Sequence, residues 1–301
     1  MTEFSILHKG EDGYGRLGSL SVRNGSVRTP ALFPVINLIG GTTLDSGSVW
    51  RHFRDNILDE DELQGVMFQA MSFLDYGLTA DNLADWREQT FREHLKQRVD
   101  VNAPIFIDSG GFKLMNSDTF GEPPAEDGSQ NDWRLYTNPD SILKLQADFG
   151  ADIIATLDYP IPPNLRAEEQ TERMEKSIES AVRCLKLIED PSQIELRDEA
   201  NDQSFQKLKG QKEHAEPAVF VAIHGHDYDT IHWYVMNFLE RIEEEGVEQP
   251  FHGFAIGSLV PLRSKTDVLI DIVQGATNAI PEKWQDEIAL HVFGVGGKQA
   301  S

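Results

Sequence analysis

The sequence has little cysteine, few basic residues and no long hydrophobic run, and each shortage excludes a class of protein. Its single cysteine, Cys184, cannot build a disulfide framework or a cysteine metal cluster. No stretch of 18 apolar residues occurs, so we expect no membrane span and no membrane partner. The N-terminal residues MTEFSILHKG are too few and too polar for a signal peptide, and we expect a cytoplasmic protein.

Basic residues are strongly outnumbered by acidic ones. The chain has 27 Lys and Arg against 50 Asp and Glu, which gives a formal net charge of −23. Such an excess indicates a solvated acidic surface, as in proteins from salt-rich, halophilic cytoplasm. It is weak evidence against nucleic-acid binding, because phosphates are normally contacted by Lys and Arg. A local basic patch within the acidic surface stays open.

Residues 1–30 predict a small antiparallel element. The stretch RLGSLSVRNGSVRTP alternates apolar and polar residues around Asn24-Gly25, a dipeptide typical of tight hairpins. From residue 31 the pattern changes to short apolar runs, most of them followed by amphipathic stretches. We therefore divide the chain into a hairpin element, 1–30, and one α/β domain, 31–301.

Seven apolar runs are too continuous for strands with one exposed face, and they predict parallel strands buried on both faces. The runs are residues 31–38, 65–73, 103–108, 152–158, 218–224, 251–257 and 288–294. Helical patterns are most visible at 81–98, 139–149, 167–187, 227–245 and 264–276. Asn138 and Pro139 predict the start of one helix and Gly150 its end, while Ser264 and Gly275 bound the last helix in the same way.

Alternating strands and helices predict either a doubly wound sheet or a (β/α)₈ barrel. Polar or glycine residues follow several of the runs. An open sheet has its functional residues at one switch point, whereas a barrel has them at the ends of many strands, so the distribution of these residues favours the TIM-barrel type. Seven strands are one short of closure, so we expect that the eighth strand is absent from this sequence. Two polar stretches, about 117–137 and 189–217, interrupt the rhythm and are interpreted as surface insertions.

On the barrel interpretation, the C-terminal ends of the strands present polar groups to one shared pocket. These groups are Asp108, Asp158, His224 and the backbone around Gly257. Two carboxylates and an imidazole suit acid–base chemistry or the binding of a polar heterocycle. A carboxylate can accept two N–H bonds from a ring such as guanine, and Gly110 and Gly111 would let a flat ligand approach the backbone.

Structural explanations stay open for the same residues. Each aspartate could instead cap the turn that follows it. The segment His224-Gly225-His226 could bind a metal, because the HxH pattern places two imidazoles on one side of an extended segment. We favour His224 facing the pocket, with His226 and Asp227 beginning a helix. His291 lies inside the last apolar run and is interpreted as a core histidine.

Five stretches, in order along the chain, resemble the queuine/archaeosine tRNA-guanine transglycosylase superfamily. They are VRTPALFPV (27–35), IDSGGFKLM (107–115), NPDSILKLQADFGADIIATLDYPIPP (138–163), HGFAIGSLVPL (252–262) and HVFGVGG (291–297). Their order and spacing follow the family from near residue 14 to the end. The resemblance implies a base exchange in which an aspartate attacks the ribose C1′ of a guanosine, guanine leaves and a 7-deazaguanine takes its place.

The resemblance also implies roles for the residues at the strand ends. Asp108 would serve in acid–base catalysis and base recognition, and Asp158 would hold the guanine-like edge. The other expected substrate-binding residues are Ser109, Gly110, Gly111, Phe112, His224, Gly225, Gly257, Ser258 and Leu259. Gln146 would support the pocket. The implied partners are a nucleic acid, tRNA or alternatively DNA, and guanine or a 7-deazaguanine base, with a homodimer left open.

The sequence departs from the family pattern at three positions of the expected pocket. Lys113 stands where the family usually has glutamine. His224 stands where the glutamine of a QGG-like segment usually binds the base. Ser258 replaces the second glycine of a GGL turn. These departures indicate a divergent member of the family, and a DNA-modifying branch is a contender.

Two expected features of the family are not found before Ser301. The nucleophilic aspartate lies on the eighth strand of the family, and its zinc ligands, three cysteines and a histidine, lie further on. We therefore expect that this chain holds no cofactor, lacks the zinc subdomain and is the pocket-bearing part of a longer enzyme. A metal-dependent barrel hydrolase using His224, His226 and Asp158 is an alternative, as is a non-catalytic subunit related to the transglycosylases.

Overall fold

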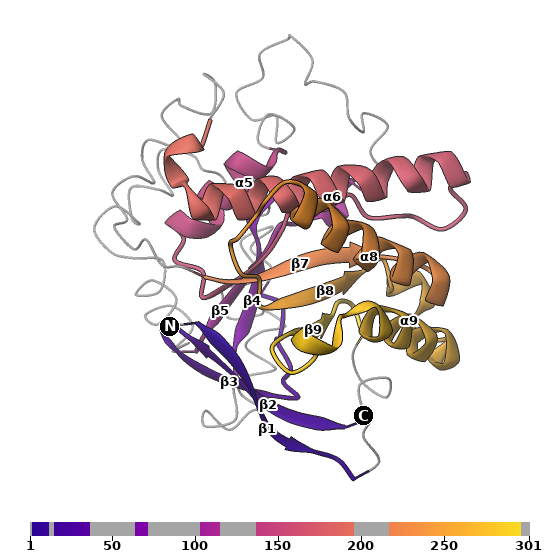
Figure 1. Cartoon of the computed structure of the whole chain (residues 1–301), viewed down its shortest axis with the longest axis horizontal. Helices are drawn as coiled ribbons and strands as arrows, with labels where there is room; N and C mark the ends of the chain where they lie inside the picture. The colour runs from indigo at the N-terminus through magenta and orange to yellow at the C-terminus, as the bar shows by residue number, and fades with distance from the viewer. Residues whose placement is uncertain are drawn as a thin grey trace, which may run out of the picture. The chain divides into compact units, whose positions relative to one another are not determined.

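Two sheets, one antiparallel and one parallel, organise the described part of the chain (Figure 1). The computed structural model describes residues 2–11, 15–36, 64–71, 103–114, 137–195 and 217–295. The helix predicted at 81–98 and most of the two predicted insertions lie outside these residues. The chain divides into two compact units. The first unit consists of Met1–Gly110, Gly121–Ile154 and Ile194–Ala218, and the second of Gly111–Phe120, Ala155–Gln193 and Val219–Ser301.

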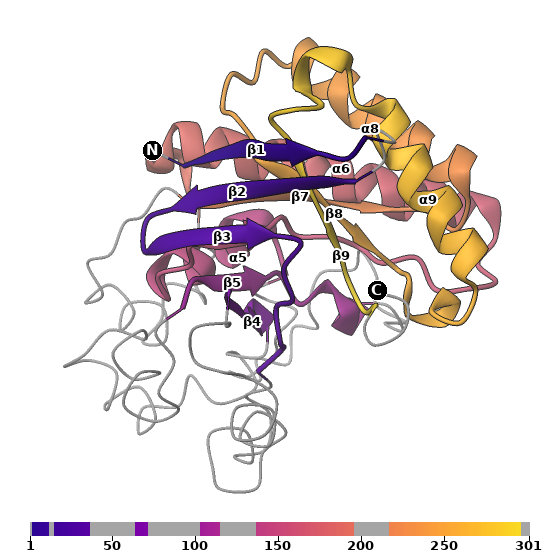
Figure 2. The ribbon, with the colours of Figure 1, turned by 90° about the horizontal axis from the view of Figure 1, so that it is seen from below.

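The antiparallel sheet belongs to the first unit. Its strands are β1 (Glu3–Lys9), β2 (Arg16–Val22) and β3 (Gly25–Thr29), and they lie side by side in this order (Figure 2). The β2–β3 hairpin turns at Asn24 and pairs Val22 with Gly25, which has φ of 141°. This confirms the hairpin predicted from the Asn-Gly dipeptide, and β1 extends it to three strands.

Six parallel strands form the second sheet, in the order β4-β5-β6-β7-β8-β9. Their bounds are β4 (Val66–Gln69), β5 (Ile105–Asp108), β6 (Ile153–Ala155), β7 (Ala218–His224), β8 (Gly253–Gly257) and β9 (Ala289–Val292). Of the first predicted strand, the described residues hold one isolated parallel bridge between Val35 and Met67. Parallel strands that follow chain order throughout are typical of a (β/α)₈ barrel, whereas a doubly wound sheet reverses its order.

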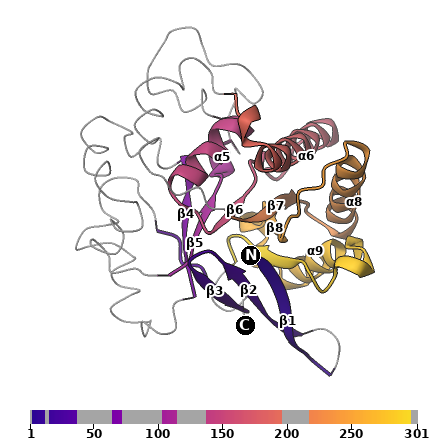
Figure 3. The same cartoon turned by 60° about the vertical axis from the view of Figure 1, so that its left-hand side comes forward.

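The strands β7 and β8 show why the apolar runs could be recognised. Every residue of both strands is buried, so neither strand alternates between buried and exposed side chains. Helices α6, α8 and α9 of the second unit lie one after another on the same side of β7 and β8 (Figure 3). A strand that is buried at every position carries apolar side chains on both faces.

The helices match the predicted positions closely. They are α5 (Pro139–Asp148), α6 (Ala167–Glu189), α8 (Tyr228–Glu244) and α9 (Thr266–Ala279), with 3₁₀ turns η2 (Gly111–Leu114), η4 (Pro191–Gln193), η5 (Val260–Leu262) and η6 (Glu282–Trp284). The Asn138 side chain accepts the amide of Ser141 at 2.9 Å and caps α5 as predicted. In the described ranges, none of the helices has the length and apolar character needed to cross a membrane.

The last helix differs from the prediction at both ends. Lys265, not Ser264, is the N-cap residue of α9, and the helix continues through Gly275 to Ala279. Gly275 lies where α9 approaches α8, since an ideal Cβ on it would stand 2.6 Å from the carbonyl oxygen of Tyr228. The predicted helix end was wrong, because this glycine permits close helix packing and does not terminate the helix.

His291 on β9 should make the stability of the folded protein depend on pH. Burial lowers its pKa to about 4, whereas an unfolded histidine titrates near about 6.5. Between these values the unfolded state binds more protons, so the free energy of unfolding decreases as the pH falls through this window. Because the side chain is only half-buried, we expect a decrease of about 1 kcal/mol between pH 7 and pH 5. Urea denaturation at both pH values should show a larger decrease in the wild type than in His291→Leu. An equal decrease in both proteins would contradict the assignment.

Candidate active site

The helix α6 fixes the loop that follows β6. Its Ser177 accepts the amide of Tyr159 at Oγ, over 2.9 Å. Its Arg173 donates from Nη1 to the carbonyl oxygens of Pro160, at 2.7 Å, and Leu114, at 3.0 Å. Burial lowers the pKa of the Arg173 guanidinium, and the two carbonyl oxygens compensate the buried charge. The same arginine thus ties the loop after β6 to η2.

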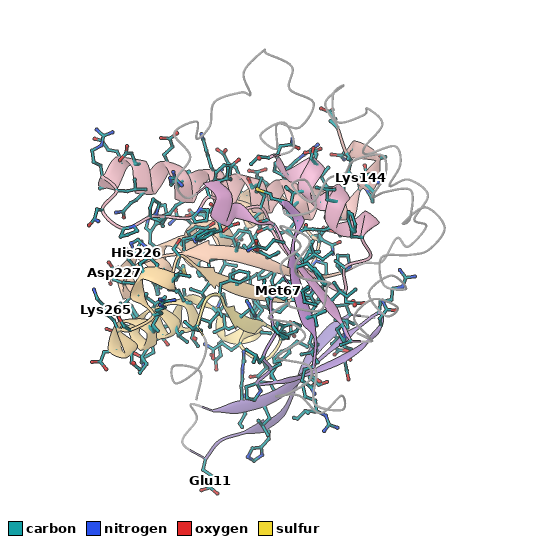
Figure 4. The ribbon with its side chains drawn as sticks, turned by 180° about the vertical axis from the view of Figure 1, so that it is seen from behind. Glu11, Met67, Lys144, His226, Asp227 and Lys265 are labelled. Atoms are coloured by element: carbon teal, nitrogen blue, oxygen red, sulfur yellow. The ribbon has the colours of Figure 1, made fainter. Side chains whose placement is uncertain are left out.

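The turns that follow β7 and β8 hold this loop from two further positions. The amide of Ile161 donates to Oγ of Ser258 at 2.9 Å, and its carbonyl oxygen lies 3.1 Å from Nε2 of His226. Burial lowers the pKa of His226, which favours a neutral ring that donates from Nε2. His226 and Asp227, labelled in Figure 4, come between β7 and α8. Asp227 accepts the amide of Thr230 at 2.8 Å and caps α8, which confirms the predicted helix start.

Asp158 and His224 meet at the ends of β6 and β7. Oδ2 of Asp158 lies 3.0 Å from Nε2 of His224, although the N–H direction is not aligned for a regular hydrogen bond. The other ring nitrogen of His224, Nδ1, lies 3.0 Å from Oγ of Ser258. The His224 side chain is 0% exposed, whereas 10% of the Asp158 side chain is exposed. The ring of Tyr234 packs edge-on against the imidazole, with centroids 6.2 Å apart.

Two glycines make room for this carboxylate and imidazole. An ideal Cβ on Gly111 would overlap Oδ1 of Asp158 and lie 2.5 Å from its carbonyl oxygen. An ideal Cβ on Gly257 would lie 2.6 Å from Cε1 of His224. Each glycine is therefore required by a neighbouring protein group, and the contact of either with a ligand stays a prediction.

Asp108, Ser109 and Gly110 belong to the first unit. Asp108 ends β5 opposite Gln69 of β4, and its Oδ2 accepts the amide of Gly110 at 3.3 Å. Ser109 is fully buried, and its carbonyl oxygen accepts the amide of Met71 at 3.2 Å. The local bond of Asp108 is the capping arrangement considered from the sequence. Its acid–base role stays a prediction.

The remaining predicted residues have different environments. Phe112 on η2 is 57% exposed, whereas Leu259, after β8, is buried. Gly225 is buried against the first turn of α8, where an ideal Cβ would lie 2.7 Å from a backbone nitrogen. Gln146 of α5 donates from Nε2 to the carbonyl oxygen of Ile107 at 2.9 Å and thereby supports β5. These contacts explain the local packing of Gly225 and Gln146 without a ligand.

Three residues that support the site were not predicted, namely Arg173, Ser177 and Tyr234. Arg173 and Ser177 lie one turn apart on α6, on the face that buries Met174 and Ile178. A charged side chain on the apolar face of an amphipathic helix is rare unless it has partners, and this was the available signal. Tyr234 is a buried aromatic residue like many others, and no local pattern indicates its contact with His224.

The histidines of the HGH segment do not face a common ligand. Nε2 of His224 faces Asp158, and Nε2 of His226 lies at the carbonyl oxygen of Ile161. Throughout the described ranges, no group of three His, Cys, Asp or Glu residues could hold a metal ion. His224 and His226 therefore do not form, with Asp158, the metal site that the hydrolase alternative requires.

The strand order defines an α/β protein of the barrel type. In such folds the loops that follow the parallel strands carry the chemistry. The model of the family described as "Queuine tRNA-ribosyltransferase" matches residues 11–300. The chain belongs to this family.

Similar proteins carry two related names. The tRNA-guanine(15) transglycosylase of Thermococcus kodakarensis is 24% identical over 299 residues, which are 98% of this chain and 39% of that protein. The protein of the same name from Methanothermobacter thermautotrophicus is 28% identical over 179 residues, 60% of this chain and 22% of that protein. The Queuine tRNA-ribosyltransferase of Thermodesulfovibrio yellowstonii is 24% identical over 287 residues, 93% of this chain and 61% of that protein. The chain thus spans less than two thirds of the length of these relatives.

Proposed function

We propose that this chain binds a guanine-type base at Asp158 and forms the base-recognition part of an enzyme that exchanges guanine in tRNA. The observation that carries the proposal is the carboxylate of Asp158 at the end of β6, followed by a loop held from α6 and from the β7 and β8 turns. Guanine presents N1–H and an exocyclic amine side by side, and a carboxylate can accept both. The names of the relatives support tRNA as the nucleic acid.

The proposed reaction exchanges one base for another at the same ribose carbon. An aspartate carboxylate forms a bond to C1′ as the bond from C1′ to guanine breaks, and the bonding electrons leave with guanine, which takes up a proton. A 7-deazaguanine then attacks C1′, releases the carboxylate and gives up its ring proton. Asp158 holds the base edge in both steps, and Asp108 transfers the proton. The attacking aspartate is assigned to the eighth strand of the family.

Asp158→Asn is the direct test of base recognition. The amide keeps the shape of the side chain and one acceptor oxygen but loses the negative charge, so we expect about 30-fold weaker guanine binding, equivalent to about 2 kcal/mol. Isothermal titration with guanine and 7-deazaguanine measures the loss. Adenine, which lacks the two adjacent donors, should bind weakly to both proteins. Asp271→Asn on α9, an exposed position, is the matched control. Unchanged guanine affinity in Asp158→Asn would exclude the base-holding role.

The nucleic acid requires a separate experiment. Labelled guanine offered to the complete protein together with tRNA and duplex DNA should enter tRNA. Incorporation into DNA alone would favour the DNA-modifying alternative. Tight binding of the base without incorporation into either acceptor would favour a non-catalytic subunit.

A further inference from the structure

His224 was expected to bind the base, but its surroundings in the second unit give it another task. The side chain is 0% exposed, and each ring nitrogen already faces a protein oxygen, Oγ of Ser258 at Nδ1 and Oδ2 of Asp158 at Nε2. Tyr234 covers the ring from one side and Gly257 lies against Cε1. A ligand could reach neither nitrogen without displacing one of these groups.

The hydrogen bonds from Ile161 through Ser258 to His224 have a consistent direction. The amide of Ile161 donates to Oγ of Ser258, so this oxygen can give its own proton to Nδ1 of His224. The ring proton then resides on Nε2 and faces Oδ2 of Asp158 at 3.0 Å. In this arrangement an N–H group of the imidazole lies against the carboxylate of Asp158, at the 3.0 Å contact without regular hydrogen-bond alignment.

Ser258 adds independent evidence that this arrangement is selected. Its φ of 63° lies in the left-handed region, where glycine is favoured and a serine is strained. The strain is offset here by the two hydrogen bonds of Oγ. The two positions that depart from the family pattern on β7 and after β8 are thus in direct contact with each other.

We propose that the His224–Ser258 pair is a positioning relay that fixes the carboxylate of Asp158, and that His224 itself makes no contact with the base. The proposal rests on the proposed function of Asp158. The imidazole lies against one carboxylate oxygen, Oδ2, and limits the rotation of the carboxylate, so the incoming base meets a carboxylate with a defined plane. Positioning of this kind improves binding because less freedom is lost when the ligand arrives.

The imidazole ¹⁵N resonances of His224 test the relay without any ligand. Ser258→Gly removes the hydroxyl group and relieves the left-handed strain, so the variant should fold. We expect this change to shift the Nδ1 resonance of His224 and Asp158→Asn to shift the Nε2 resonance, while neither moves the signals of His232 on α8. The His224→Gln variant assigns the resonances. Unchanged His224 resonances in Ser258→Gly would overturn the relay.

Base binding supplies the second readout. Ser258→Gly should weaken guanine binding about 5-fold and His224→Gln about 10-fold, and the double variant should lose no more than the worse single variant, because both act through one chain. Multiplied losses in the double variant would overturn the relay. If the wild type binds no guanine while the ¹⁵N shifts behave as expected, the proposed function fails and the relay stands. Covalent labelling of Ser258 by a fluorophosphonate would instead identify a Ser–His–Asp nucleophile and overturn the positioning role.

Discussion

Gly111→Ala should abolish guanine binding and lower the free energy of unfolding by about 3 kcal/mol. The added methyl group would lie 2.5 Å from the carbonyl oxygen of Asp158 and 2.8 Å from its Cγ. The loop cannot move aside freely, because Arg173 and Ser177 hold its backbone on the α6 side. The carboxylate must therefore turn away from the position in which it would accept the base. Calorimetric titration with guanine and urea denaturation measure the two effects.

Two further variants separate this clash from a general cost of replacing glycine. Gly15→Ala places its methyl group where no atom lies within 4 Å, so its stability and base affinity should equal those of the wild type. Asp158→Ala in the Gly111→Ala background removes the overlapping carboxylate, so stability should recover in part while guanine binding stays absent. Guanine affinity unchanged by Gly111→Ala would show that Asp158 does not occupy this position when the base binds.

The described strands could be predicted because burial on both faces leaves a local signal. Residues 218–224 form an unbroken apolar run, and all seven residues of β7 are buried. Helix starts were readable where a side chain caps its own helix, as Asn138 and Asp227 do. The role of Gly275 could not be predicted in this way, because the contact that requires a glycine there is made with another helix, α8. Local signals therefore predicted elements, whereas contacts between elements stayed hidden.

The candidate site shows the same division. Asp158 and His224 were singled out because they follow apolar runs, and Ser258 through the family resemblance, yet nothing in their spacing predicts that one imidazole contacts the other two side chains. That contact arises because parallel strands bring their C-terminal ends together across long stretches of sequence. The supporting residues Arg173 and Ser177 were missed because they act from α6 on the backbone of a loop that precedes it.

Asp152→Ala should lower the free energy of unfolding by about 3 kcal/mol, through a contact within the first unit that the sequence did not reveal. Asp152 is 1% exposed, and its Oδ2 accepts the amide of Ile105 at 2.8 Å. Its Oδ1 accepts the amide and the side-chain Nδ2 of Asn24 at 3.2 Å and 2.7 Å. Removal of the carboxylate would leave the buried Ile105 amide without this acceptor. It would also detach the hairpin turn from the start of β5.

Hydrogen exchange identifies which amides lose protection when Asp152→Ala lowers the stability. In Asp152→Ala the amides of Asn24 and Ile105 should exchange faster than in the wild type, and urea denaturation should show the lower stability. Asn24→Ala removes one of the three donors, the side-chain Nδ2, so it should cost less by itself and add little in the Asp152→Ala background, because both changes remove the same side-chain bond. Asp271→Ala, at an exposed position on α9, should leave exchange and stability unchanged. If stability and both amides are unaffected by Asp152→Ala, this carboxylate does not join the hairpin to the parallel sheet, and the antiparallel element must be held by other contacts.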